Sequence, residues 1–174
     1  MQSNLDRLAC IGLVVGAVFG LAGTLIASPI PRAILWTVDG AALAMATALL
    51  TIKYFSLRRD LVAAGFLVFA IGQANVLSTA GQLVVPAAPI FATGAACWAV
   101  GLAMISAGDE FPFWVRIVGF VASVLFAVTS LMIQAGMGLN AVSIPLPFFA
   151  YPVLVLTFVG WIISIGWPTT STRE

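Results

Sequence analysis

Long apolar stretches alternate with short polar or proline-containing segments along the whole chain. Six such stretches lie near residues 8–27, 33–52, 61–83, 88–106, 112–135 and 147–167. Each is close to the length of about 20 mostly apolar residues that a helix needs to cross a bilayer. The pattern predicts an all-α, polytopic membrane bundle, in which residues 1–174 form a single transmembrane domain of six helices.

Composition strengthens this prediction. Hydrophobic residues make up 62% of the chain and charged residues only 7%, whereas soluble domains carry about 25% charged residues. The connections between the apolar stretches are too short to hold a soluble domain. Membrane lipid is therefore the expected surrounding of most of the chain.

The basic residues predict the orientation in the membrane. Six of the seven lie in or beside the N-terminus, the second and fourth connections and the C-terminus: Arg7, Lys53, Arg58, Arg59, Arg116 and Arg173. Only Arg32 falls on the other side. Because Lys and Arg concentrate in cytoplasmic loops, both termini are expected to be cytoplasmic, with the protein in the cell inner membrane. The net charge of +1 gives no electrostatic basis for binding nucleic acid.

The residue types exclude most catalytic chemistry. The chain has no histidine, which removes the usual haem and zinc ligand and the usual general base. The apolar stretches hold no pair of carboxylates, and the nucleophile motif G-x-S-x-G is absent. Cys10 and Cys97 lie at different depths, which argues against a disulfide. The sequence therefore predicts no catalytic residue, no cofactor and no metal site, and so a protein that is not an enzyme.

Small residues recur at four-residue spacing in the first two predicted helices. Gly12, Gly16 and Gly20 share one face of the first, and Gly40 and Ala44 share one face of the second. Small residues let two helix backbones approach closely in lipid. The pattern predicts an antiparallel hairpin of these two helices. In the alternative interpretation, the glycine face joins two copies of the chain or binds a partner in a membrane complex.

Asp39 is the only acidic residue inside a predicted span. It lies seven residues after Arg32, or about 10 Å below the outer end of the second helix. A charged side chain within the bilayer is costly, so such residues usually face the bundle interior and often mark a functional site.

Uncharged polar residues gather at a similar depth on other helices. In the third apolar stretch, polar residues repeat at intervals of three and four, so one helical face is expected to carry them all. The predicted ligand-binding residues are Asp39, Asn75, Ser78, Thr79, Gln82, Thr129 and Gln134. In the structural alternative these groups only join helices through hydrogen bonds, each worth about 0.6 kcal/mol. The inner half has no matching polar path, which favours a dead-end pocket over a pore.

The C-terminal part of the chain resembles a known family. The run Glu110-Phe111-Pro112-Phe113-Trp114-Val115-Arg116-Ile117-Val118-Gly119 is followed by an apolar span, a proline-rich stretch and a final span that ends Gly160-Trp161-Ile162-Ile163. This order is similar to that of a family of small bacterial six-helix membrane proteins of unknown function. The resemblance covers roughly the last 65 residues, and it implies a six-helix architecture without implying any chemistry.

Two functional hypotheses follow from these patterns. In the first, an outward-side pocket around Asp39 binds or transports a small ligand, cationic or protonatable, and Asn75, Thr79 and Gln82 orient it. In the alternative, the chain is a non-catalytic accessory or assembly subunit of a larger membrane complex, and the polar residues only support packing.

Overall fold

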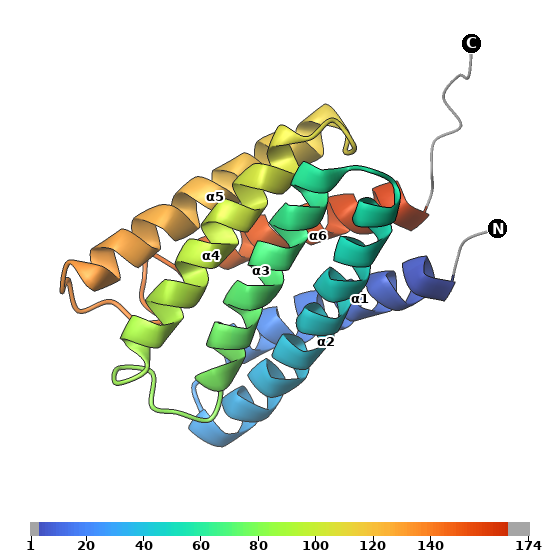
Figure 1. Cartoon of the computed structure of the whole chain (residues 1–174). Helices are drawn as coiled ribbons and strands as arrows, with labels where there is room; N and C mark the ends of the chain where they lie inside the picture. The colour runs from blue at the N-terminus through green and yellow to red at the C-terminus, as the bar shows by residue number, and fades with distance from the viewer. Residues whose placement is uncertain (1–3, 167–174) are drawn as a thin grey trace, which may run out of the picture.

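The chain folds into a bundle of α-helices, as Figure 1 shows. The computed structural model describes residues 4–166, and every regular element in that range is helical. The helices are α1 (Asn4–Leu25), α2 (Pro29–Ser56), α3 (Asp60–Ser78), α4 (Ala88–Ala107), α5 (Phe113–Gln134) and α6 (Ala150–Gly166). The all-α prediction is confirmed.

The helices of the described chain close into a ring. Each packs against the next one in sequence, and α6 also contacts α1. In Figure 1, α2, α3, α4 and α5 form a row, and α1 and α6 lie behind it. Short connections make consecutive helices antiparallel, so the first residues of α1, α3 and α5 and the last residues of α2, α4 and α6 share one end of the bundle.

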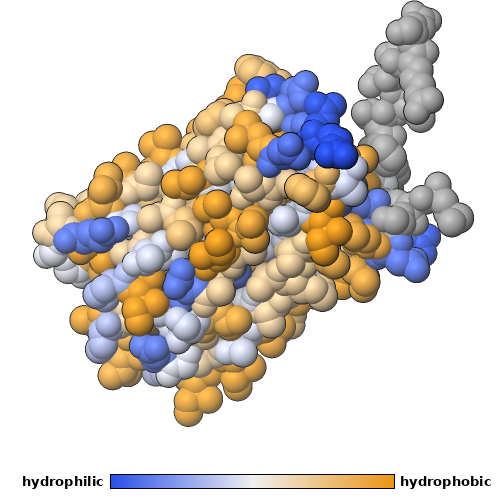
Figure 2. Space-filling model, in the orientation of Figure 1, coloured by the Kyte–Doolittle hydropathy of each residue, from blue (hydrophilic) through white to orange (hydrophobic). Residues whose placement is uncertain are grey.

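The surface of the bundle is that of a multi-pass membrane protein. Helices α1 to α5 are long and apolar enough to cross a membrane, whereas α6 is apolar but has 17 residues. Large apolar side chains lie exposed on the flanks; Leu131 on α5, for example, is 68% exposed. Figure 2 shows hydrophobic residues over much of the flank, with hydrophilic residues mainly toward the ends.

Two helix boundaries differ from the expected spans. Helix α3 ends at Ser78 instead of near residue 83, because the next N–H groups form turns: Thr79 N–H bonds to the Val76 carbonyl, and Gln82 N–H bonds to the Thr79 carbonyl. Helix α6 begins at Ala150 instead of near residue 147. Two prolines precede it, and proline lacks the N–H that a helix interior requires.

The glycine row of α1 packs against α2, so the predicted hairpin is confirmed. A Cβ added to Gly12 would lie 2.8 Å from the carbonyl oxygen of Ala42, and one added to Gly16 would overlap the side chain of Leu43. Since α2 fills this face, a second copy or a partner could use the row only by displacing α2.

Aromatic side chains fill the interior of one half of the bundle. We call this set the aromatic plug, and its members are Tyr54, Phe66, Phe69, Phe111, Phe158 and Trp161. Trp161 is its centre, with ring centroids 4.9 Å from Phe66 and 5.4 Å from Phe158. Tyr54 continues the contacts toward the end of α2, at 5.5 Å from Phe66.

Charged side chains are concentrated at the end of the bundle beyond the plug, which we call the basic end. It carries five of the predicted cytoplasmic cations: Arg7, Lys53, Arg58, Arg59 and Arg116. Arg173 lies outside the described residues. Carboxylates balance these cations, because Lys53 Nζ lies 2.7 Å from Asp6 Oδ1 and Arg59 Nε lies 3.3 Å from Glu110 Oε1. Arg32 lies at the opposite end.

Candidate ligand site

A cavity lies inside the ring, on the other side of the plug from the basic end. Its walls come from α1, α2, α3, α4 and α6 and from the loop before α6. It offers about 50 Å³ to the centres of water-sized molecules. A water needs roughly 10–15 Å³ on this measure, so the cavity has room for about three to five water molecules.

Asp39 supplies the only acidic side chain among the described residues that line the cavity. Helix α2 begins with a proline in its first turn, where the missing N–H costs nothing. Further along α2, Asp39 and Leu43 lie one turn apart on the face that packs against α1 and lines the cavity. The carboxylate packs against the backbone of α1, since a Cβ on Gly20 would lie 3.0 Å from Asp39 Cγ. A methyl group at position 20 would make the carboxylate shift by a few tenths of an ångström.

The Asp39 carboxylate is buried without a partner. The residue is 9% exposed, and its Oδ1 atom is covered and accepts no hydrogen bond from any described group. No described cation lies within ion-pair distance of it. Buried charges are normally paired or fully hydrogen-bonded because desolvation is expensive. Asp39 has neither kind of partner in the described chain, and a carboxyl group in this position suits a positively charged ligand, which would pair with its ionised form.

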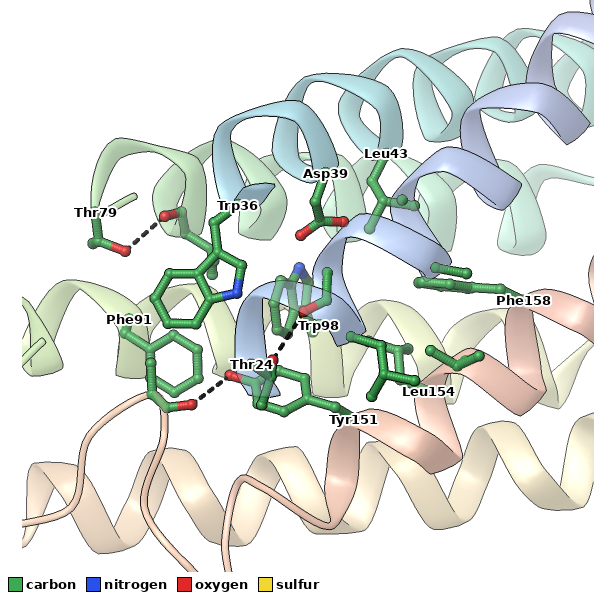
Figure 3. A pocket seen from close by; sticks show the side chains of 17 residues that line it. Thr24, Trp36, Asp39, Leu43, Thr79, Phe91, Trp98, Tyr151, Leu154 and Phe158 are labelled. Atoms are coloured by element: carbon green, nitrogen blue, oxygen red, sulfur yellow. Dashed lines mark hydrogen bonds between the residues drawn. The ribbon is translucent and has the colours of Figure 1, made fainter. Parts of the chain in front are cut away.

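Aromatic rings contribute to the cavity wall from α2, α4 and α6. Five line the cavity together with Asp39, and Figure 3 shows them around it: Trp36, Phe91, Trp98, Tyr151 and Phe158. Each ring face carries partial negative charge, which attracts cations placed over it. A wall of one carboxylate and several rings is therefore electrostatically suited to an organic cation.

Trp98 is held rigidly by its neighbours and has an unpartnered N–H. Its ring stacks on Phe69 at 5.7 Å and meets the edge of Phe126 at 5.2 Å. The residue is 3% exposed, and its Nε1 atom has no hydrogen-bond acceptor among the described residues. A buried tryptophan N–H usually finds a partner, so this residue of the cavity wall carries a second unsatisfied buried group.

The hydroxyl groups around the cavity donate to backbone carbonyls. Thr24 Oγ1 donates to Gly20 O at 2.9 Å, and Thr79 Oγ1 donates to Val76 O at 2.7 Å. Tyr151 Oη donates to Ala141 O at 2.9 Å, which ties the loop before α6 to the cavity wall. Figure 3 shows these three bonds as dashed lines. Each of these hydroxyl protons is therefore already in a hydrogen bond, whereas the Nε1–H of Trp98 is not.

The structure brings only Asp39 and Thr79 of the predicted site residues to the cavity. The other three on or beside α3 bond to their own backbone: Asn75 to Ile71 O at 3.2 Å, Ser78 to Asn75 O at 2.6 Å and Gln82 to Ser78 O at 2.9 Å. The single polar face expected over residues 75–82 does not form, because α3 ends at Ser78 and Gln82 lies in the turn beyond it.

The predicted residues on α5 also lie away from the cavity. Thr129 Oγ1 donates to Leu125 O at 2.8 Å, within its own helix. Gln134 Nε2 donates to Ser130 Oγ at 2.9 Å, and Ser130 donates to Ala92 O on α4 at 2.8 Å. Of these groups, Ser130 joins α5 to α4 and Gln134 bonds to it, as in the structural alternative, whereas Thr129 bonds only within α5. Helix α5 contributes no residue to the cavity wall.

Sequence reasoning did not assign the aromatic wall to the site. Trp98 gave one signal, because a tryptophan deep in a span needs a partner for its N–H. The other rings could have been taken for ordinary packing or interface residues. Gln73 is a further buried polar residue, 1% exposed with neither amide atom partnered, but it does not line the cavity.

Comparisons with known proteins add no assignment to this geometry. No family model, curated protein or solved structure matches the chain. The resemblance of the C-terminal part to a six-helix family therefore stays a prediction. Among residues 4–166, no group of three or more His, Cys, Asp or Glu side chains could hold a metal ion. Function must be argued from the cavity itself.

Proposed function

We propose that all six helices cross the cell inner membrane and that both termini are cytoplasmic. The cations of the basic end support this orientation, because cytoplasmic loops retain Lys and Arg. The apolar loop residues before α6 add length to that short helix. In this orientation the cavity belongs to the outward half. Asp39 lies ten residues after Pro29, or about 15 Å from the outer start of α2.

We infer that the protein binds a small organic cation at Asp39, and that an ammonium group is the part it recognises. The observation that carries this proposal is the unpartnered, buried carboxylate in a cavity walled by aromatic rings. An ammonium would pair with the carboxylate and lie against the ring faces. The size of the cavity favours a ligand of about three to five non-hydrogen atoms, one for each water it could hold.

Binding from the outward side is the simplest activity of such a site. The aromatic plug fills the interior between the cavity and the basic end, with Trp161 only 1% exposed. Transport to the cytoplasm would require these rings to move apart. We therefore propose binding as the basic activity, and transport as an extension that depends on rearrangement of the plug.

Calorimetric titration with methylammonium chloride tests the proposal. The purified protein would be placed in phosphatidylcholine nanodiscs, because this lipid has no primary amine. We expect saturable binding to one site, and affinity about 100-fold lower in Asp39→Asn, since losing one partner of a buried charged pair costs several kcal/mol. Asp60→Asn is the matched control, because Asp60 lies at the exposed start of α3 on the basic end, and it should bind as the native protein does.

Two results would contradict the proposal. Equal affinity in Asp39→Asn and the native protein would remove Asp39 from the site. If the native protein binds no small ammonium ion but co-purifies from the membrane with a second protein, the accessory-subunit hypothesis would replace the binding function. If methylammonium does bind, uptake of the labelled ion into proteoliposomes distinguishes transport from binding alone.

A further inference from the structure

Two residues that line the same cavity each carry a buried atom without a partner, and the two atoms have opposite hydrogen-bonding character. An ionised carboxylate such as that of Asp39 only accepts hydrogen bonds, and the indole Nε1–H of Trp98 only donates them. Both atoms are without a partner in the described chain, and both residues are at least nine-tenths buried. In the view of Figure 3, the indole nitrogen of Trp98 lies on the edge of its ring nearer to Asp39.

A simple ammonium ion satisfies only one of these two atoms. Its N–H groups donate to Asp39, but it has no lone pair to accept a bond from Trp98. A ligand that also pairs this buried donor should bind about tenfold more tightly than one that leaves it unpaired. A ligand that carries both an ammonium group and an oxygen acceptor would satisfy both atoms at once.

The dimensions of the cavity limit how far apart these two groups can be. Space for about three to five water-sized units admits an ammonium nitrogen, a hydroxyl oxygen and a short carbon link. A 1,2-amino alcohol such as ethanolamine has four non-hydrogen atoms, which fits this space.

We propose that the cavity selects small 1,2-amino alcohols of the ethanolamine class. The ammonium pairs with Asp39, and the hydroxyl oxygen accepts a hydrogen bond from Trp98 Nε1. This inference rests on the proposed cation-binding function and adds a specificity-determining residue, Trp98, to it. The rings of Phe69 and Phe126 fix the direction of the indole N–H, so the site would recognise the oxygen without reorganising.

Competition between ethanolamine and n-propylamine tests the inference, because the two amines have the same number of non-hydrogen atoms and differ by a hydroxyl in place of a methyl group. In phosphatidylcholine nanodiscs the native protein should bind ethanolamine about tenfold more tightly. An apolar pocket without a donor would prefer n-propylamine. In Trp98→Phe, ethanolamine should lose about tenfold in affinity while n-propylamine changes much less, so that the preference disappears. Binding of n-propylamine also shows that this variant is folded.

Trp161→Phe is the matched control, because it makes the same chemical change in the plug, away from the cavity wall. It should keep the preference for ethanolamine. The inference is overturned if the native protein binds both amines equally, or if Trp98→Phe keeps the preference. In that case continued loss of binding in Asp39→Asn would leave the cation-binding function standing, whereas failure of both amines to bind would remove both proposals.

A phosphatidylethanolamine headgroup offers the same ammonium and oxygen chemistry as free ethanolamine. Repeating the titration in nanodiscs that contain this lipid distinguishes the two sources. Unchanged affinity for ethanolamine supports a free amino alcohol as the ligand, and competitive loss of affinity supports the headgroup. Either result requires a site with the proposed chemistry.

Discussion

At the basic end of the bundle, the Lys53 ammonium lies 2.7 Å from Asp6 and the Arg59 guanidinium lies 3.3 Å from Glu110. Around Asp39, on the other side of the plug, no described cation lies within ion-pair distance. Both Asp6 and Asp39 extend from helices of the same hairpin. The first is part of an ion pair between α1 and α2, while the second is more deeply buried and has no such partner.

The comparison separates charges that support the fold from a charge that does not. Removing either member of a partly buried ion pair leaves the other uncompensated, so these residues contribute to stability. An unpaired buried carboxylate costs stability instead. Asp39 lies on the wall of a cavity without such a partner, which is why we propose it as the group that receives a ligand.

The largest effect is expected from breaking the plug that separates the two regions. Trp161→Ala removes the ring at the centre of the plug and leaves an empty space there. The free energy of unfolding should therefore fall by about 3 kcal/mol. Denaturation in mixed micelles measures this. Trp114→Ala is the control, because Trp114 is 47% exposed on the flank and its loss should change stability far less. Equal losses in the two variants would show that the plug is not a packed core.

Neutralising the two aspartates gives a sharper test of the comparison. Asp6→Asn leaves the partly buried Lys53 without its charge partner and should destabilise the protein by about 1–2 kcal/mol, less than a fully buried pair because water still reaches it. Asp39→Asn removes a carboxyl group that has no partner in the described chain and should leave stability unchanged or raise it by up to about 1 kcal/mol. The same denaturation assay compares them. A greater loss in Asp39→Asn than in Asp6→Asn would mean that Asp39 is structural.

Helix packing and the direction of Asp39 could be predicted from the sequence because both depend on local spacing. Glycines four residues apart place Gly12, Gly16 and Gly20 on one face of α1, and the structure packs that face on α2. The positions of the basic residues in the sequence likewise predict which loops lie together at one end of the bundle. A single acidic residue in an apolar helix is expected to face the bundle interior instead of lipid, and Asp39 does so.

The rest of the cavity wall could not be predicted, because it depends on how helices rotate and end when they pack. Asn75 and Ser78 bond to their own backbone at the end of α3, instead of facing the bundle with Thr79. Tyr151 reaches the cavity only because the loop before α6 folds back and offers the Ala141 carbonyl to it. Neither feature follows from residue spacing within a helix.

A smaller change beside Asp39 tests the geometry of the site. Gly20→Ala places a methyl group 3.0–3.1 Å from the carboxylate atoms of Asp39, which must then shift by a few tenths of an ångström. We expect affinity for methylammonium to fall about fivefold to tenfold, because charged hydrogen bonds depend on position. Gly81→Ala is the control, since nothing lies within 4 Å of an added Cβ there. Full affinity in Gly20→Ala would show that the carboxylate position is unimportant.

The smallest effect is expected at Arg32, the cation at the opposite end from the basic end. Its Nε donates to Ile26 O at 2.9 Å, just beyond the last residue of α1, so it supports the end of that helix. Arg32→Gln should lower stability by about 0.5 kcal/mol and leave methylammonium affinity within twofold, roughly the scatter of such measurements. A large loss of affinity would indicate that Arg32, and not only Asp39, acts on the ligand.

Infrared difference spectroscopy tests most directly whether the Asp39 carboxyl group contacts the cation. Spectra of the protein in nanodiscs would be recorded before and after addition of methylammonium. We predict a change in the carboxyl stretching region of the native protein that is absent from Asp39→Asn and retained in Asp60→Asn. If methylammonium binds and the carboxyl bands do not change, or if the same change persists in Asp39→Asn, Asp39 is not the group that receives the cation.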